Sequence, residues 1–125
     1  MSDKKTILAI DDDITILNTI RSVLEETYEV SLAKNTDSAL TILKTTQVDL
    51  ILLDLNMPIA SGADFLEYIR RDASLYRIPV IVVSSQGTVN VRTEAREKGA
   101  VDFVIKPISP DILREKIHAH LNTGT

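Results

Sequence analysis

Five short runs rich in apolar residues recur along the chain. They occupy positions 7–10, 28–32, 48–53, 79–83 and 101–105. Short aliphatic runs of this kind are typical of strands buried on both faces of a parallel sheet. The run at 28–32 instead alternates apolar and polar residues, which predicts a half-buried strand near the edge of the sheet.

Between and after these runs, apolar residues recur three or four positions apart, which predicts five amphipathic helices. The apolar stripes are Ile14, Leu17, Ile20, Val23 and Leu24; Ala39, Leu40, Ile42 and Leu43; Phe65, Leu66 and Ile69; Val91 and Ala95; and Ile112, Leu113, Ile117 and Leu121. The fourth stripe is short, so that helix is only weakly apolar. Residues 56–62 contain proline and glycine and are predicted to form a loop.

Polar residues, glycine and proline mark where several helices begin or end. Asp13 is expected to cap the first helix, and Thr36 is a candidate cap for the second. Ser109 is expected to cap the last helix, with Pro110 at its first position. Gly99 stands where a residue in the left-handed conformation would end the fourth helix.

Strands and helices alternate along the whole chain. This order predicts an α/β fold, a flavodoxin-like, doubly wound, five-stranded parallel sheet with five helices. We expect the strand order 2-1-3-4-5. We expect a single domain over residues 1–125. In this strand order the first and third strands are neighbours. Asp11 and Asp12, after the first strand, should therefore meet Asp54, after the third.

Polar groups suited to phosphoryl chemistry follow four of the strands: Asp11 and Asp12, Asp54, Ser84 and Lys106. Clustered carboxylates repel unless a cation joins them, and ligation by oxygen alone suits Mg²⁺ or Mn²⁺. Asp54 is the best candidate nucleophile, because a carboxylate can accept a phosphoryl group as an acyl phosphate. Lys106 and Ser84 are suitable partners for the added oxygens.

Composition narrows the function classes. The formal net charge is −4, which leaves no basic surplus for direct binding of nucleic acid. Cysteine is absent, which excludes disulfide and thiolate chemistry and fits a reducing compartment. The start of the chain is polar and the apolar runs are too short for a membrane span, so we expect a cytoplasmic protein without membrane contact.

From about Thr6 to Leu121 the chain resembles the receiver domain of the bacterial two-component response regulators. The resemblance rests on the acidic pair at 11–12, on Asp54, on Ser84 and on the lysine–proline pair at 106–107. It implies that residues 1–125 form one receiver (response regulatory) domain. A cis bond commonly precedes such a proline in the family, so one is expected here.

The resemblance also implies a role for each site residue. Asp54 would be the phosphoacceptor, and Lys106 would bind the phosphoryl oxygens. The implied Mg²⁺ ligands are Asp12 directly, Asp11 directly or through water, Asp54, and the backbone carbonyl of Asn56. The implied switch residues are Ser84 and Phe103, and the residues implied to tune dephosphorylation are Asn56 and Gln86.

Four positions depart from the family pattern. Ser84 stands where threonine is frequent, and Ser85 where alanine or glycine is common. Ser61 replaces an acidic residue often found before Gly62. Phe103 stands where tyrosine is frequent, so it cannot offer a phenol hydrogen bond to a partner, although its ring can still be buried. A plain core role is the alternative for this residue.

The resemblance implies a phosphorylation-operated switch rather than an enzyme. A histidine kinase, a histidine phosphotransfer protein or a small acyl phosphate would donate to Asp54 in the presence of Mg²⁺. The surface reporting the change would comprise the fourth helix, the fifth strand and the fifth helix, where a downstream target or output domain would dock. The chain is either a stand-alone regulator or the receiver of a larger protein.

Two other function classes stay open. An aspartate-nucleophile phosphohydrolase of the haloacid dehalogenase type also uses a strand-end aspartate with Mg²⁺, but it places a second acid two residues later, where this chain has Asn56. A phosphorylation-independent interaction module would keep only the fold, and the intact set of site residues argues against it.

Other polar residues are expected to have ordinary structural roles. Asp13 should cap a helix rather than bind metal. His118 and His120 lie two positions apart on the last helix, so they cannot form a metal pair and should face solvent. The charged residues of 92–98 are also expected to be solvated.

Overall fold

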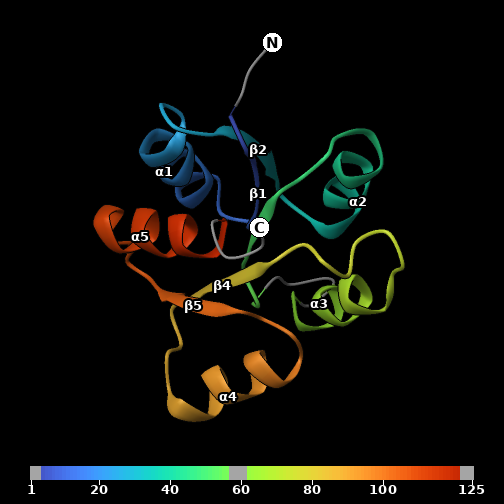
Figure 1. Ribbon diagram of the computed structural model, residues 1–125. Coiled ribbons are helices and arrows are strands. Elements are labelled where there is room, and N and C mark those ends of the chain that lie inside the picture. Colours follow the sequence, from blue (N-terminus) through green and yellow to red (C-terminus); the bar gives the residue numbers. More distant parts are fainter. Residues whose placement is uncertain (1–3, 57–61, 122–125) are drawn as a thin grey trace.

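The computed structural model describes residues 4–56 and 62–121 and contains one parallel sheet of order β2-β1-β3-β4-β5 (Figure 1). The strands are β1 (Thr6–Ile10), β2 (Glu29–Ala33), β3 (Leu50–Leu53), β4 (Val80–Ser84) and β5 (Asp102–Ile105). The helices are α1 (Ile14–Leu24), α2 (Thr36–Thr45), α3 (Gly62–Arg71), α4 (Val89–Glu97) and α5 (Pro110–Leu121). The predicted fold class, strand order and number of helices are confirmed.

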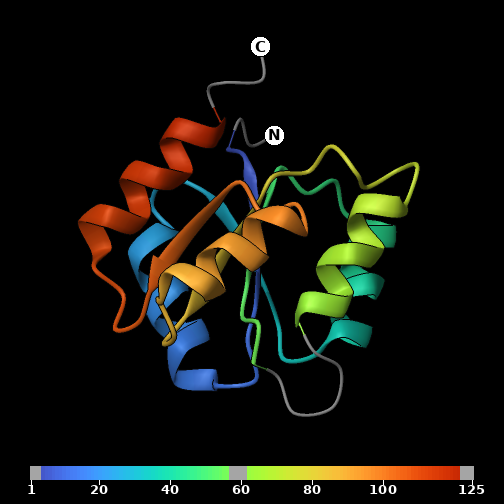
Figure 2. The ribbon, with the colours of Figure 1, turned by 90° about the horizontal axis from the view of Figure 1, so that it is seen from below.

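Two hydrophobic cores lie on opposite faces of the sheet. Figures 1 and 2 show α1 and α5 together on one side and α2 and α3 together on the other. Because side chains alternate along a strand, Leu8 and Ile10 of β1 enter the core under α2 and α3, whereas Ile7 and Ala9 enter the core under α1 and α5. Burial on both faces explains why the central strands are continuously aliphatic.

Several boundaries differ slightly from the predicted ones. Asn35, not Thr36, caps α2, and its side chain accepts from the Ser38 amide. The central strand begins at Leu50, although Val48 is also buried. The first difference arises because asparagine and threonine both carry a side-chain oxygen that can cap a helix, and the second because burial can extend a residue or two beyond the assigned end of a strand.

Two residues of the predicted apolar stripes are exposed. Ile14 and Ile112 are 46% and 49% exposed. Each lies in the first turn of its helix, which begins a few residues after the preceding strand ends. The remaining residues of the two stripes pack as predicted, with Leu17, Ile20, Leu113 and Ile117 buried.

Two glycines allow close approaches that a larger residue would prevent. Gly99 has a φ of 112°, which confirms the predicted left-handed end of α4. Gly62, the first residue of α3, lies against the backbone of Asp54 and Leu55, and a Cβ atom there would collide with the Asp54 carbonyl oxygen. The missing side chain therefore lets α3 begin directly against the strand end that carries Asp54.

Within residues 4–56 and 62–121, no helix combines the length and the apolar character needed to cross a bilayer.

We predict that Gly62→Ala destabilises the fold by about 1–3 kcal/mol, the usual cost of forcing extra volume into a packed site. Alanine favours helices more than glycine does, but backbone atoms cannot move aside as a side chain can. The free energy of unfolding in urea measures this effect. Gly87→Ala is the matched control, because the added Cβ would meet side-chain atoms of Ile105 and Arg92 and no backbone atom, and side chains can rotate away. Equal stabilities of the two variants would contradict the prediction.

Candidate functional site

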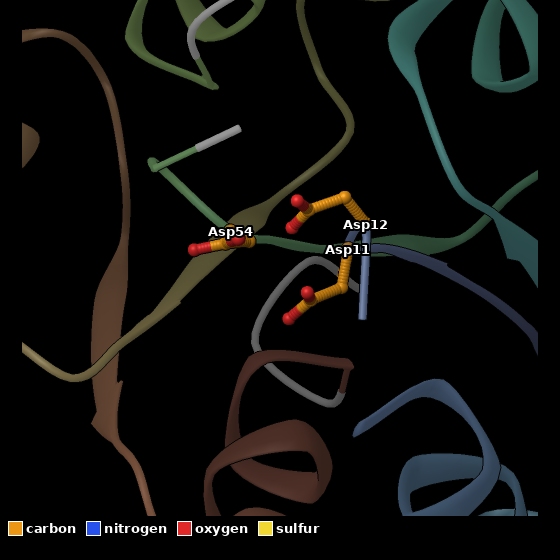
Figure 3. A group of neighbouring side chains, drawn as sticks. All are labelled: Asp11, Asp12 and Asp54. Carbon is orange, nitrogen blue, oxygen red and sulfur yellow. The ribbon is translucent and has the colours of Figure 1, made fainter. Parts of the chain in front are cut away.

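Three carboxylates meet where β1 and β3 end. Asp11 and Asp12 follow β1, Asp54 follows the neighbouring β3, and one oxygen of each lies within 4.8 Å of the others (Figure 3). Asp11 and Asp54 are buried, whereas Asp12 is exposed. The sequence correctly predicted this cluster, because parallel strands end at the same edge of the sheet. Asp13 lies outside the cluster and caps α1 by accepting from the Thr15 amide, as predicted.

Lys106 is the cation nearest to the cluster among the described residues, and it lies at the end of β5. Its Nζ is 2.8 Å from Oδ2 of Asp11 and 3.8 Å from Oδ1 of Asp54. The Lys106 amide donates to the Ser84 carbonyl, which holds the backbone at this position. The Lys106–Pro107 bond is cis, as expected. In this state the ammonium group therefore pairs more closely with Asp11 than with the candidate phosphoacceptor.

The environment makes Asp54 unusually ready to accept a proton. Burial is the main cause that raises the pKa of its carboxyl group, and the charges of Asp11 and Asp12 raise it further. A hydrogen bond from the Asn56 amide and the charge of Lys106 act in the opposite direction without reversing the shift. A negative charge on Asp54 is thus costly in the folded protein unless a cation joins it.

Lys106 is held as a cation. Burial opposes its charge, but the hydrogen bond to Asp11 and the nearby charges of Asp11 and Asp54 outweigh burial and raise the pKa of the Lys106 ammonium group. The site therefore keeps one fixed positive charge against its three carboxylates.

Ser84 ends β4, is buried, and takes part in two contacts at the site. Its Oγ accepts from the Gln86 amide at 3.2 Å and lies 3.4 Å from Nδ2 of Asn56. The Asn56 amide meanwhile donates to Oδ1 of Asp54 at 3.2 Å. Asn56 therefore touches both Asp54 and Ser84. The contact between its side chain and Ser84 was not predicted, because it depends on the path of the loop after β3.

Phe103 is buried in β5, under the side chain of Arg92 from α4. The Arg92 guanidinium carbon lies 5.4 Å from the centre of the Phe103 ring, and Arg92 Nε donates to the Gly87 carbonyl at 3.0 Å. Arg92 is exposed, as predicted, but these contacts also connect α4 with the segment after Ser84. Burial of Phe103 agrees with both interpretations of the ring given above.

The expectation that His120 faces solvent is wrong. Its Nε2 lies 2.9 Å from Oδ2 of Asp102, whose other oxygen accepts from Lys116 Nζ at 2.9 Å. Burial opposes the Asp102 charge, but the hydrogen bonds from Lys116 and His120 lower the pKa of this carboxyl group.

The departure at Ser61 lies outside the described residues, as does most of the loop predicted at 56–62.

Comparison with known proteins gives one consistent family. The sequence pattern of the response regulator receiver domain matches residues 7–118. The chain is 36% identical over 118 residues to the phosphate regulon transcriptional regulatory protein PhoB of Pseudomonas aeruginosa, a match that covers 94% of this chain and 52% of PhoB. It is 38% identical over 109 residues to the alginate regulator AlgB of that organism, a match that covers 86% of this chain and 24% of AlgB. The chain thus spans about half or less of the length of these relatives.

Solved structures give the same result. The chemotaxis protein CheY4 of Vibrio cholerae superposes with a TM-score of 0.87 at 26% identity, covering 93% of this chain and 98% of CheY4. The receiver domain of the Francisella response regulator 1452 superposes with a TM-score of 0.89 at 26% identity, covering 98% of this chain and all of that domain (100%). Together with the match over residues 7–118, these likenesses show that the chain belongs to the response regulator receiver domain family.

Proposed function

We propose that this chain is a phosphoacceptor switch of a two-component phosphorelay, in which Asp54 receives a phosphoryl group. The supporting observation is the buried Asp54 carboxylate, which lies in one cluster with Asp11 and Asp12 and near the Lys106 ammonium group. The donor would be a histidine kinase or a histidine phosphotransfer protein. The chain itself would act as a signalling domain in the cytoplasm rather than as an enzyme with a substrate of its own.

The cluster fits a divalent cation. Its three carboxylates offer oxygen atoms only, within 4.8 Å of one another, which is the donor set that Mg²⁺ prefers. Asp11, Asp12, Asp54 and the Asn56 backbone carbonyl would hold the ion. When bound, Mg²⁺ would supply positive charge that offsets the carboxylates and the incoming phosphoryl oxygens.

The protein's own residues would orient the transfer. A carboxylate oxygen of Asp54 would form the bond to phosphorus as the bond to the donor imidazole nitrogen, or to the acetate of acetyl phosphate, breaks. The Asn56 amide orients the Asp54 carboxylate through Oδ1. Lys106 Nζ, now 3.8 Å from Oδ1 of Asp54, would turn from Asp11 toward the new phosphoryl oxygens.

The same transfer would move the switch residues. Ser84 Oγ, which now accepts from the Gln86 amide and contacts Asn56, would turn toward the phosphoryl oxygens. The segment after Ser84 would follow, and Phe103 would adjust under Arg92. A target or output domain would then recognise the surface formed by α4, β5 and α5. Asn56 and Gln86, beside the acceptor and the hydroxyl, would tune dephosphorylation.

The two other function classes are less well supported. A phosphohydrolase of the haloacid dehalogenase type needs a second acid two residues after the nucleophile, and this chain has an amide there, Asn56. An interaction module that ignores phosphorylation would have no need to bury Asp54 beside two other carboxylates.

We predict that acetyl phosphate with Mg²⁺ labels wild-type protein to about one phosphoryl group per chain, and that labelling is lost in Asp54→Asn and when EDTA removes the metal. Intact mass spectrometry measures the added phosphoryl mass. Asp13→Asn is the matched control, because Asp13 lies outside the cluster and asparagine can still cap α1. Many turnovers of acetyl phosphate would instead indicate a hydrolase, and wild-type protein without label would indicate an interaction module.

We also predict that Asp54→Asn stabilises the metal-free protein at neutral pH, by about 1 kcal/mol. The raised pKa means that the folded state binds a proton on Asp54 more readily than the unfolded state does. The cost of the charge is therefore full above the folded pKa and disappears as the pH falls below the unfolded value of about 3.9. Urea unfolding in EDTA at neutral and at acid pH measures the difference.

Glu26→Gln is the control for this prediction, since Glu26 is exposed and the same exchange of carboxylate for amide should change stability little. A loss of stability in Asp54→Asn at neutral pH, or a gain that is equally large at acid pH, would show that charge at Asp54 is not costly in the folded state.

A further inference from the structure

The two ends of α4 are held very differently. At its C-terminal end, Ala95 and Ala100 are buried, and the Ala100 amide donates to the Ala95 carbonyl. Lys98 Nζ forms an ion pair at 3.6 Å with Glu67 of α3. The Gly99 carbonyl accepts from Nε of Arg70, also of α3, at 3.0 Å. The C-terminal end of α4 is therefore connected to α3 by consecutive residues.

Arg70 is the central part of this connection. Its guanidinium group donates to three backbone carbonyls, those of Gly99 at 3.0 Å, Tyr76 at 2.6 Å and Ile78 at 3.0 Å. These contacts are hydrogen bonds and not ion pairs, since all three acceptors are neutral carbonyls. The planar fork of arginine matches several acceptors at once. Arg70 thus joins three segments: α3, the connection to β4, and the turn between α4 and β5.

The fit around Arg70 leaves little freedom. A Cβ atom on Gly99 would lie 2.6 Å from both Cγ and Nε of Arg70, so the turn and the arginine side chain are in close contact. Gly99 also has a φ of 112°, which few other residues adopt. The turn after α4 is therefore fixed both by its own backbone and by the arginine.

The N-terminal end of α4 has no comparable attachment to α3 among the described residues. Val89 is 79% exposed, and Ala95 is the only buried residue of the helix. The polar contacts of this end are the cap from Thr88 and the side chain of Arg92, which reaches the Gly87 carbonyl and the Phe103 ring. Val91 is partly buried against the hydrophobic core, but this contact is apolar and fixes no hydrogen bond or ion pair. The polar contacts therefore lead to the segment after Ser84 and to the Phe103 ring rather than to α3.

We propose that Arg70 is a positioning residue that fixes the C-terminal end of α4, so that α4 pivots about Lys98 and Gly99 while its N-terminal end moves with the segment after Ser84. This inference rests on the proposed function, because phosphorylation of Asp54 supplies the displacement. A helix held at one end and pulled at the other turns a small movement of Ser84 Oγ into a larger one at Val89, the most exposed apolar residue of α4.

Distances between spin labels test the pivot. The chain has no cysteine, so pairs of introduced cysteines can be labelled without background. One pair is Lys44→Cys with Val89→Cys, and the other is Lys44→Cys with Glu97→Cys. All three positions are exposed, and Lys44 in α2 serves as the fixed reference. Distances are measured by pulsed electron paramagnetic resonance with and without Mg²⁺ and beryllium fluoride, a stable mimic of the phosphoryl group.

In wild-type protein we expect the 44–89 distance to change by about 2 Å or more and the 44–97 distance to stay constant. In Arg70→Met we expect a broader distribution of 44–97 distances than in wild-type protein before the mimic is added. We also expect the mean 44–97 distance to change when the mimic binds. Arg71→Met is the matched control, because Arg71 is the exposed neighbour on the same helix, and it should behave as wild type. If Arg70→Met does not fold, Arg70→Lys replaces it, since lysine keeps the charge but loses the fork.

The outcomes separate the two proposals. Equal changes of both distances in wild-type protein, no change of the 44–89 distance despite bound mimic, or identical behaviour of the Arg70 and Arg71 variants would overturn the pivot. Fluorine NMR reports whether beryllium fluoride binds. No binding to wild-type protein would overturn the proposed function, and the pivot that rests on it would fall as well.

Discussion

Repulsion among the three carboxylates at the ends of β1 and β3 governs how the charged groups around them are arranged. The proximity of Asp11, Asp12 and Asp54 raises the electrostatic free energy of the folded protein, because Asp11 and Asp54 are buried. Lys106 relieves part of this cost through its 2.8 Å contact with Asp11. Lys106 follows β5, so the strand order must leave its side chain within reach of the carboxylates at the ends of β1 and β3.

The fold and the acidic cluster could be predicted because both follow from short-range patterns. Aliphatic runs locate the strands, and their alternation with helices indicates a doubly wound parallel sheet. The expected order 2-1-3-4-5 then brings Asp11 and Asp54 together. Prediction failed where two neighbouring residues can both cap a helix, and where a contact partner lies far away in the sequence. Asn35 and Thr36 are both good caps, and the contact of His120 with Asp102 depends on how α5 is placed along β5.

The Arg70 contacts were beyond sequence reasoning for a related reason. An arginine near the end of an amphipathic helix is usually solvated, and nothing in the chain marks this one as different. Its three acceptors belong to a loop and a turn, at Tyr76, Ile78 and Gly99, whose paths are set only by the packed structure. Contacts of this kind, between segments far apart in the sequence, are therefore found only in the folded structure.

Asn56 contacts Asp54 through its backbone amide and Ser84 through its side chain. One position therefore borders both the group that would be modified and the group that would respond. Under the proposed function, we expect that an exchange of this side chain during evolution alters both how long a signal persists and how strongly the resting protein resists activation. Selection for a faster or slower response would then carry an unavoidable change in background output, unless a second substitution compensates.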